Sequence, residues 1–312
     1  MCSVVKTLVD IPSVDMRNQA SRIPEFCYGK RLILFAIVFL CGIVITGFFD
    51  GFLNIATASR SRLLCGITIQ NLITFALPAF IFACILTKKP ACFLRLTRGF
   101  SCKALAGVLI VFALGMPFLN QLVAWNEALR LPASMSVVEV QLKSLEASAK
   151  AMSDVLLNVD SFGSMLVGFL LIGCLTGFCE ELFFRGALQR MLQGRSVGPQ
   201  LSIWISAVIF SIMHFQFYGF VPRIILGAFF GYLLLWSDSI WLSATAHALN
   251  NGLVVLSSWL SAKGVVSNLD NLGVTMGKFQ WIALISFVVV LALLFVGKDW
   301  LFKSHNKISC DG

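Results

Sequence analysis

The sequence predicts an all-α membrane protein, a polytopic bundle of about eight transmembrane helices. Hydrophobic residues make up 58% of its 312 residues and charged residues 12%, whereas roughly a quarter of the residues in a soluble domain are charged. A chain of this length can supply such a bundle, because each crossing of a ~30 Å hydrocarbon core needs about 20 residues. The composition therefore excludes an ordinary soluble globular domain.

Eight apolar runs are the candidate spans, and no internal repeat or low-complexity linker separates them. They are residues 32–49, 63–87, 104–125, 162–191, 199–217, 224–236, 239–260 and 280–297. The fourth run is unusual, because its helical pattern continues through the acidic pair Glu180-Glu181 to Arg190. The sixth run is short and begins beside Arg223.

The basic residues of the loops predict the orientation of the chain. Lys and Arg are concentrated in segment 1–31 and loop 88–103, whereas loop 126–160 has three basic and five acidic residues. Because loops rich in Lys and Arg stay on the cytoplasmic side, we expect both termini in the cytoplasm. Loop 50–62, with two arginines, departs mildly from this alternation. The net charge of +9 thus belongs to loops that flank membrane spans. Loop 88–103 is expected to contact anionic lipid, and no nucleic-acid partner is expected.

A different kind of helix is predicted at residues 136–156. Ser136 and Glu139 have the spacing of a capping box, and apolar residues then recur at helical steps. These apolar residues are Val138, Leu142, Leu145, Ala149, Met152 and Leu156. We expect an amphipathic connector along the membrane interface, with a lid or substrate guide over the site as the alternative.

The strongest functional signal is the acidic pair Glu180-Glu181, which follows an uncharged stretch of 19 residues, 161–179. Adjacent carboxylates at that depth are costly unless a pocket, a partner or a proton compensates them. Glu181 and Arg185 are four residues apart on one helix face and can form an ion pair. Glu180 is offset by about 100° and has no partner within its own helix. Glu180 is therefore the candidate reactive carboxylate, and a charge cluster at the helix end is the alternative.

Later spans supply further polar candidates. His214 follows Phe210 by four residues in an otherwise uncharged run. His247 and Asn251 are also four residues apart, so both side chains project from one face of the seventh span. A lone buried histidine is often a satisfied core residue. Two histidines, a carboxylate and an amide in separate spans are harder to explain as structure alone. The sequence thus predicts a site between helices four, five and seven.

These residue types suit hydrolysis of a peptide bond. A carboxylate beside an imidazole can deprotonate water, while a second imidazole and an amide N–H can stabilise the oxyanion. A metal is the competing account, because Glu180, His214 and His247 would form a His₂Glu set like that of catalytic zinc sites. The HExxH motif is absent. A zinc ion and a metal-free mechanism are equally consistent with the sequence.

At these residues the chain resembles the CPBP family of intramembrane proteases. The EExxxR motif of that family corresponds to Glu180–Arg185, its FxxxH motif to Phe210–His214, and its HxxxN motif to His247–Asn251. Gly227 and Gly231 precede the third motif with GxxxG spacing, which allows close helix packing. The family includes the CAAX prenyl endopeptidases of the Ras-converting type. It also includes bacterial homologues linked to bacteriocin processing, immunity or lysostaphin resistance.

The resemblance covers about residues 160–260 and implies a role for each of six polar residues. By this resemblance, water is activated by Glu180 and His214, the oxyanion is held by His247 and Asn251, and the site is supported by Glu181 and Arg185. It implies an enzyme in a bacterial cytoplasmic membrane that cuts a membrane-associated peptide or protein. The metal dependence of the family is disputed, so the resemblance does not decide the zinc question.

We expect one domain with four segments along the chain. They are a cytoplasmic N-terminal segment at 1–31, membrane helices with the connector at 32–160, the CPBP core at 161–260, and the last helix with a polar tail at 261–312.

Three other functions are compatible with parts of the sequence. A non-enzymatic scaffold or bacteriocin-immunity factor would not need a reactive Glu180. A proton-coupled transporter could use Glu and His as relays, but no paired halves or inverted repeat are visible. Cys179 beside His214 could be a nucleophile, although the adjacent carboxylate of Glu180 opposes thiolate formation.

Overall fold

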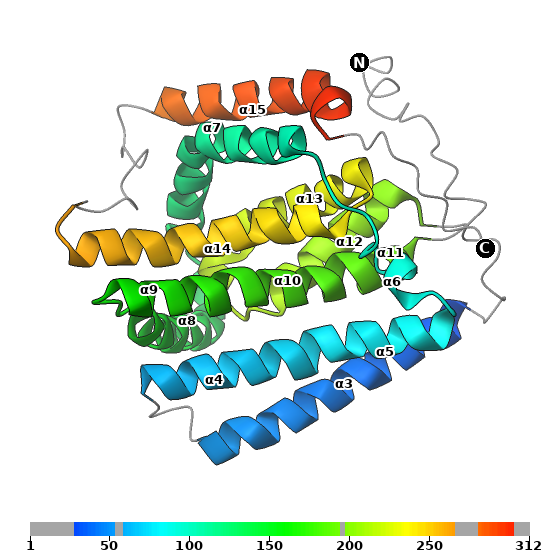
Figure 1. The fold of residues 1–312 in the computed structure, drawn as a ribbon. Coiled ribbons are helices and arrows are strands. Elements are labelled where there is room, and N and C mark those ends of the chain that lie inside the picture. Colours follow the sequence, from blue (N-terminus) through cyan, green and yellow to red (C-terminus); the bar gives the residue numbers. More distant parts are fainter. Residues whose placement is uncertain (1–27, 54–58, 194–196, 266–279, 303–312) are drawn as a thin grey trace.

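Figure 1 shows the chain as a bundle of long helices. This computed structural model describes residues 28–53, 59–193, 197–265 and 280–302. Within these ranges all regular structure is helical and no strand is present. Most of the predicted N-terminal segment and of the polar tail lies outside the described residues.

Several of the helices follow one another without a break and form one longer span; η2, η4 and η5 are π-helical, and η3 and η6 are 3₁₀ turns. In chain order the bounds are α3 Tyr28–Leu53; α4 Arg60–Gln70, η2 Asn71–Ala76 and α5 Leu77–Leu86; α6 Pro90–Phe93; α7 Cys102–Glu127; η3 Ala133–Met135 and α8 Ser136–Leu156; α9 Phe162–Gly168, η4 Phe169–Leu175, α10 Thr176–Glu181, η5 Leu182–Gln189 and α11 Arg190–Leu192; α12 Pro199–Ile212; η6 Phe217–Gly219 and α13 Phe220–Ser237; α14 Ile240–Ala262; and α15 Gln280–Leu301.

All eight apolar runs of the sequence correspond to helices, so the predicted polytopic helical bundle is confirmed. Among the described residues, six helices are long and apolar enough to cross a membrane, which makes the chain an integral membrane protein. They are Gly29–Phe49, Arg60–Leu86, Cys102–Glu127, Phe162–Leu192, Phe217–Ser237 and Trp281–Leu301. The two remaining runs are α12, with 14 residues, and α14, whose 23 residues include several polar ones. These two helices are the ones that lead to His214 and carry His247.

Both ends of the described chain lie on one side of the bundle. In Figure 1, α3 begins and α15 ends at the same side. An even number of membrane crossings would give this arrangement. Which side faces the cytoplasm stays a prediction from the distribution of Lys and Arg.

Two spans widen locally into π-helix. Arg60–Leu86 contains η2, and Phe162–Leu192 contains η4 and η5 on either side of α10. A π-helical turn removes carbonyls from the regular i→i−4 pattern and is frequent at functional sites. Accordingly, the hydroxyl of Thr176 donates to the carbonyl of Leu171, five residues earlier, at 3.0 Å. The acidic pair thus lies on a short α-helical segment between two distorted ones.

Small residues bring the fourth span against α14 in the middle of the bundle (Figure 1). A Cβ on Gly177 would lie 2.8 Å from the backbone nitrogen of Ala248, and one on Gly173 would lie 3.3 Å from its carbonyl oxygen. Towards α3, the rings of Phe35 and Phe183 pack with their centroids 4.9 Å apart. Close backbone contact therefore fixes α10, with its two carboxylates, directly beside α14.

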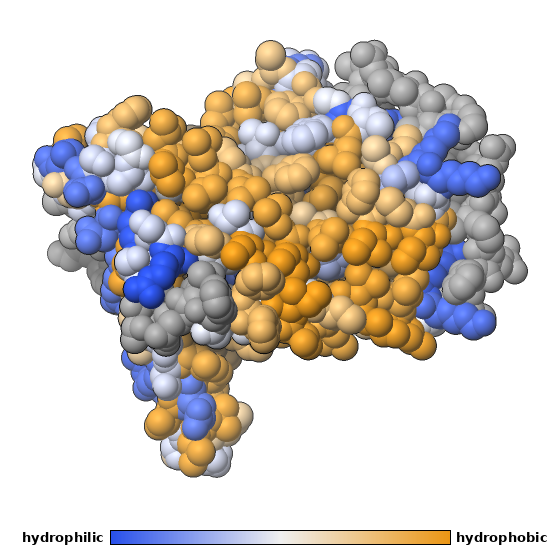
Figure 2. All heavy atoms as spheres, turned by 60° about the horizontal axis from the view of Figure 1, so that its bottom comes forward, coloured by the Kyte–Doolittle hydropathy of each residue, from blue (hydrophilic) through white to orange (hydrophobic). Residues whose placement is uncertain are grey.

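Helix α8 has the predicted bounds but not the predicted cap. Met135 is its N-cap residue and makes no side-chain cap bond, so the capping box predicted at Ser136 is wrong. Glu139 instead pairs with Lys143 one turn later, at 2.7 Å, and this bond is the largest cause of the lowered pKa of Glu139. Val137 and Val140 are 76% and 66% exposed. Figure 2 shows an arm that projects from the body of the bundle at the position of α8, and a place at the membrane interface stays a prediction for this helix.

The basic loop after α5 is partly structural. Arg95 is buried, and its Nε lies 2.8 Å from Oδ1 of Asp238 in the turn between α13 and α14. Arg98 pairs with the other carboxylate oxygen of Asp238, and its carbonyl accepts from the hydroxyl of Ser239 at 2.6 Å. The expectation that the whole loop contacts lipid is therefore wrong for these two arginines. Burial lowers the pKa of Arg95, and the charge of Asp238 opposes that shift.

Candidate active site

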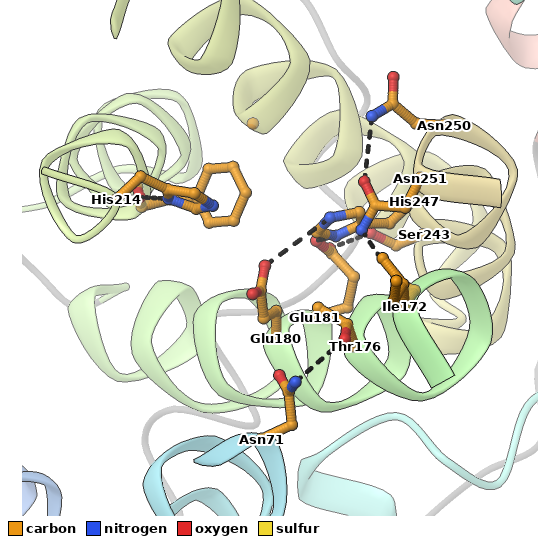
Figure 3. A network of polar contacts seen from close by, with 12 residues as sticks. Asn71, Ile172, Thr176, Glu180, Glu181, His214, Ser243, His247, Asn250 and Asn251 are labelled. Atoms are coloured by element: carbon orange, nitrogen blue, oxygen red, sulfur yellow. Dashed lines mark hydrogen bonds and ion pairs between the residues drawn. The ribbon is translucent and has the colours of Figure 1, made fainter. Parts of the chain in front are cut away.

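The two adjacent glutamates of α10 point to different surroundings. Glu180 and Glu181 are 8% and 0% exposed, so both carboxylates are inside the protein. In Figure 3 the side chain of Glu181 lies against α14, whereas that of Glu180 points towards the space between His247 and His214. The offset of about 100° per residue around a helix produces this divergence.

The carboxylate of Glu181 is fully occupied. Its Oε1 accepts from Nη1 of Arg185 at 2.7 Å and from Nδ1 of His247 at 2.9 Å. Its Oε2 accepts from the hydroxyl of Ser243 at 2.5 Å. The predicted ion pair with Arg185 is therefore present. Because three donors from two helices meet on one carboxylate, Glu181 joins the fourth span to α14.

Arg185 is completely buried and fits between helices because Gly227 leaves room for it. Its Nη2 donates to the carbonyl of Gly227 at 2.8 Å, and a Cβ on Gly227 would lie 3.1 Å from that nitrogen. One turn later, Nε2 of Gln189 donates to the carbonyl of Gly231 at 3.3 Å. A Cβ on Gly231 would lie 2.7 Å from Oε1 of Gln189. The GxxxG spacing thus accommodates two polar side chains of the neighbouring helix.

His247 is held by Glu181 and Phe230 and presents one nitrogen. A carboxylate can only accept, so Nδ1 of His247 donates to Glu181 and this bond fixes the tautomer of the neutral ring. The ring stacks on Phe230 with centroids 4.9 Å apart and an interplanar angle of 19°. Nε2 faces Oε2 of Glu180 at 3.7 Å, which is too long for a direct hydrogen bond.

Oε2 of Glu180 is buried and has no hydrogen-bond partner among the described residues. Buried carboxylate oxygens are usually satisfied, so an exception points to a functional demand. This oxygen lies beside Nε2 of His247, which carries a lone pair when Nδ1 donates to Glu181, so a water between them can donate to both. The pair can receive a water molecule or a polar group of a substrate between them.

The sequence predicts that His214 lies inside a span, but the structure places it in the turn after α12. The helix ends at Ile212, and Nδ1 of His214 donates to the carbonyl of Phe210 at 2.8 Å. Carbonyls at a helix end lack a partner in the next turn, and the histidine side chain supplies one here. The FxxxH spacing therefore places the ring on the last turn and leaves Nε2 for other partners.

Phe210 also brings the two histidines to one place. Its ring centroid is 4.8 Å from that of His214 and 5.7 Å from that of His247, with an edge-on arrangement in both cases. The ring of Phe184 in the fourth span also packs on Phe210, with centroids 5.1 Å apart, so the three predicted segments converge on one aromatic ring. The predicted meeting of helices four, five and seven is present, although His214 belongs to the turn after the fifth.

Asn251 lies one turn beyond His247 on the same face of α14 (Figure 3). Its Nδ2 donates to the carbonyl of Ile172 in η4 at 3.4 Å, and its Oδ1 accepts from Asn250 at 3.2 Å. The amide nitrogen carries two hydrogens, so one N–H remains for a substrate oxygen.

Two residues near these groups were not identified from the sequence. Ser243 precedes His247 by four residues, and this spacing was a usable signal. Asn71 offered no local signal, because its contact with the fourth span depends on packing between helices that are distant in the sequence. It is buried, and its Nδ2 donates to Thr176 at 3.0 Å, one turn before Glu180. Its Oδ1 is buried without a hydrogen-bond partner among the described residues.

The candidate metal ligands fit zinc by type but not by grouping. Both His214 and His247 hold Nδ1 with a protein oxygen and leave Nε2, which suits an imidazole ligand and equally a base. In the part of the chain that the structure describes, no group of three His, Cys, Asp or Glu residues could hold a metal ion. We therefore derive no step through a metal from Glu180, His214 and His247.

A comparison with protein families agrees with this site. Residues 162–253 match the family model of the type II CAAX prenyl endopeptidase Rce1-like domain. The match lies within the predicted core 161–260 and includes every predicted site residue. No curated protein and no solved structure matches the chain. Together with the three motifs, this match supports membership of the CPBP family of intramembrane proteases for residues 162–253.

Proposed function

We propose that the protein is an intramembrane endopeptidase that hydrolyses a peptide bond of a membrane-associated peptide or protein. The observation that carries the proposal is the buried pair of Glu180 and His247. Its two facing atoms are 3.7 Å apart, and Oε2 of Glu180 has no partner among the described residues. A carboxylate kept in this state inside an apolar bundle needs a function to explain it.

In this proposal Glu180 and His214 activate the water. Nδ1 of His214 donates to Phe210, so Nε2 carries the lone pair that can accept a proton. A water held by Glu180 gives its proton to one of these groups, and its oxygen attacks the carbonyl carbon of the substrate. The new C–O bond creates a tetrahedral oxyanion.

His247 and Asn251 then stabilise the oxyanion. Glu181 occupies Nδ1 of His247, so only Nε2 can meet the substrate, and it donates there when the ring carries both protons. The second N–H of the Asn251 amide is the other donor. When the C–N bond breaks, the proton taken from water passes to the leaving amine. Water and amide are thereby converted into a carboxylic acid and an amine.

The membrane position defines the substrate class. Glu180 lies in Phe162–Leu192, a helix long and apolar enough to cross a membrane, so we expect a substrate to enter from lipid or from the membrane interface. We propose a bacterial cytoplasmic membrane with both termini in the cytoplasm, on the basis of the family and the loop charges.

The test compares new protein N-termini in membranes from cells that express wild type, Glu180→Gln or Cys179→Ser. Glu180→Gln keeps the size of the side chain but cannot take a proton. Cys179→Ser changes the neighbouring buried residue. We expect new N-termini in wild type and Cys179→Ser, and their absence in Glu180→Gln.

Other outcomes have defined meanings. Identical profiles at equal expression would contradict proteolysis and favour a scaffold or immunity factor. Cleavage lost only in Cys179→Ser would identify a cysteine nucleophile. Solute flux that depends on a pH gradient in proteoliposomes, together with unchanged N-termini, would identify a transporter.

A further inference from the structure

His214 lies on a turn that is unfavourable by its sequence. Phe215, the next residue, has a φ of +53°, a left-handed conformation that residues other than glycine, asparagine and aspartate rarely adopt. Its side chain is 66% exposed, so packing of the phenylalanine does not hold this conformation. Strained residues persist where neighbouring contacts determine the backbone. The contacts on the segment that follows therefore set the position of His214.

The first contact comes from α7. Asn126 is 1% exposed, and its Nδ2 donates to the carbonyl of Phe217 at 3.0 Å. Its Oδ1 accepts from the backbone nitrogen of Val221 at 2.8 Å. One buried amide therefore holds the 3₁₀ turn η6 by both its entry and its exit. Asn126 lies outside the segment that matches the family model.

The second contact comes from α13. Nη2 of Arg223 donates to Oε1 of Gln216 at 2.8 Å, and Nη1 donates to the carbonyl of Gln216 at 3.4 Å. The guanidinium lies against Gly219, where a Cβ would be 2.7 Å from Nη2.

We propose that Asn126 and Arg223 are positioning residues that hold the turn of His214 and thereby aim its free Nε2 at the reacting water. They contact Gln216, Phe217 and Val221, all of which follow the strained residue, and touch neither Glu180 nor His247 through a hydrogen bond given by the structure. The role of His214 as a base rests on the proposed function. Its fixed position does not.

The test is nitrogen-15 NMR of histidine-labelled full-length protein in lipid nanodiscs. The chain has only three histidines, so each signal can be assigned with a single His→Gln variant. In wild type we expect His214 and His247 to show a protonated Nδ1. In Asn126→Ala we expect the His214 signals to shift and broaden while those of His247 stay in place. Unchanged His214 signals in Asn126→Ala would overturn the proposal.

Two variants separate positioning from a general loss of structure. Ser286→Ala removes another buried polar contact of α7, where Ser286 bonds Leu114 and Phe118, and should leave the His214 signals unchanged. Arg223→Lys keeps the charge but cannot bridge both oxygens of Gln216. We expect it to shift the His214 signals, and wild-type signals in this variant would remove Arg223 from the proposal.

A rescue experiment tests the link with strain. Asparagine tolerates the left-handed conformation better than phenylalanine. Phe215→Asn should therefore restore the His214 signals in the Asn126→Ala background, and no restoration would overturn the argument from strain.

Once a substrate is known, a purely structural role can be distinguished by kinetics. We expect kcat of Asn126→Ala to fall roughly tenfold to a hundredfold with little change in KM, because misplacement of a reacting group affects chemistry more than binding. If the NMR result holds but Glu180→Gln still cleaves, the proposed function fails and the positioning inference stands. If the His214 signals are unchanged in Asn126→Ala but Glu180→Gln is inactive, the positioning inference fails and the proposed function stands.

Discussion

The surroundings of Glu181 and of Glu180 differ more than the positions of two neighbouring residues suggest. Glu181 accepts from Arg185, His247 and Ser243, and both of its oxygens are satisfied. Glu180 has one buried oxygen without a partner among the described residues, and the nearest histidine nitrogen is 3.7 Å away. The same side chain is thus a structural element in one position and an available reactive group in the next.

The difference shows how a membrane protein can keep a reactive carboxylate in place. The hydrogen bonds of Glu181 fix α10, α14 and the ring of His247. The carboxylate of Glu180 is therefore held in place without hydrogen bonds of its own. Buried ion pairs contribute little net stability when complete, but leaving one charge alone is strongly destabilising. The two regions should therefore respond oppositely to substitution.

The largest effect is expected from Glu181→Gln. Arg185 would be left fully buried beside a neutral amide, which should lower the free energy of unfolding by about 3–5 kcal/mol. The measurement is thermal unfolding of the purified protein in detergent. The double variant Glu181→Gln/Arg185→Met removes both charges and should recover part of the loss. Full stability in Glu181→Gln would contradict the comparison.

Glu180→Gln should have the opposite profile. Loss of a general base typically lowers the rate by about 10²–10⁴-fold. Stability should be unchanged or slightly higher, because a buried carboxylate with an unpaired oxygen is replaced by a neutral amide. Cleavage rate and unfolding temperature, measured on one preparation, check both parts. A marked loss of stability would show that Glu180 is structural like its neighbour.

Ser243→Ala sharpens the comparison at the third bond of Glu181. The hydroxyl is completely buried and bonds a charged group at 2.5 Å, so its loss should cost about 2 kcal/mol of unfolding free energy. Ser257→Ala on the same helix is the control, since that exposed hydroxyl bonds only the carbonyl of Val254. Equal unfolding temperatures for the two variants would argue against a network centred on Glu181.

The sequence predicts the parts of this arrangement that depend on helical periodicity. All eight apolar runs are helices, the connector 136–156 has the bounds of α8, and Glu181 pairs with Arg185. Each of these follows from spacing along one helix. The same rule places Ser243, His247 and Asn251 on one face of α14, and applying it further would have identified Ser243.

The sequence does not reveal contacts between distant helices or the exact ends of helices. Asn71 and Asn126 reach the site region only through packing of η2 and α7, which no local pattern encodes. His214 lies in a turn because its own side chain satisfies a carbonyl at the end of α12, an event that apolar run length cannot detect. Arg95 and Arg98 belong to a loop that is basic by composition but is folded onto Asp238.

The smallest effect on stability is expected from Asn251→Ala, which tests the amide proposed to bind the oxyanion. Its amide makes only long contacts, at 3.4 Å to Ile172 and 3.2 Å from Asn250, so stability should change by less than about 1 kcal/mol. If one N–H of this amide meets the oxyanion, removing it should lower kcat by about 10²–10³-fold, the range for loss of one oxyanion donor. Asn250→Ala is the matched control, because it changes the neighbouring amide and leaves the donor of Asn251 intact. Comparing kcat and KM of the two variants on one substrate checks the assignment. A larger fall in kcat for Asn250→Ala than for Asn251→Ala would move the oxyanion donor to the neighbouring residue.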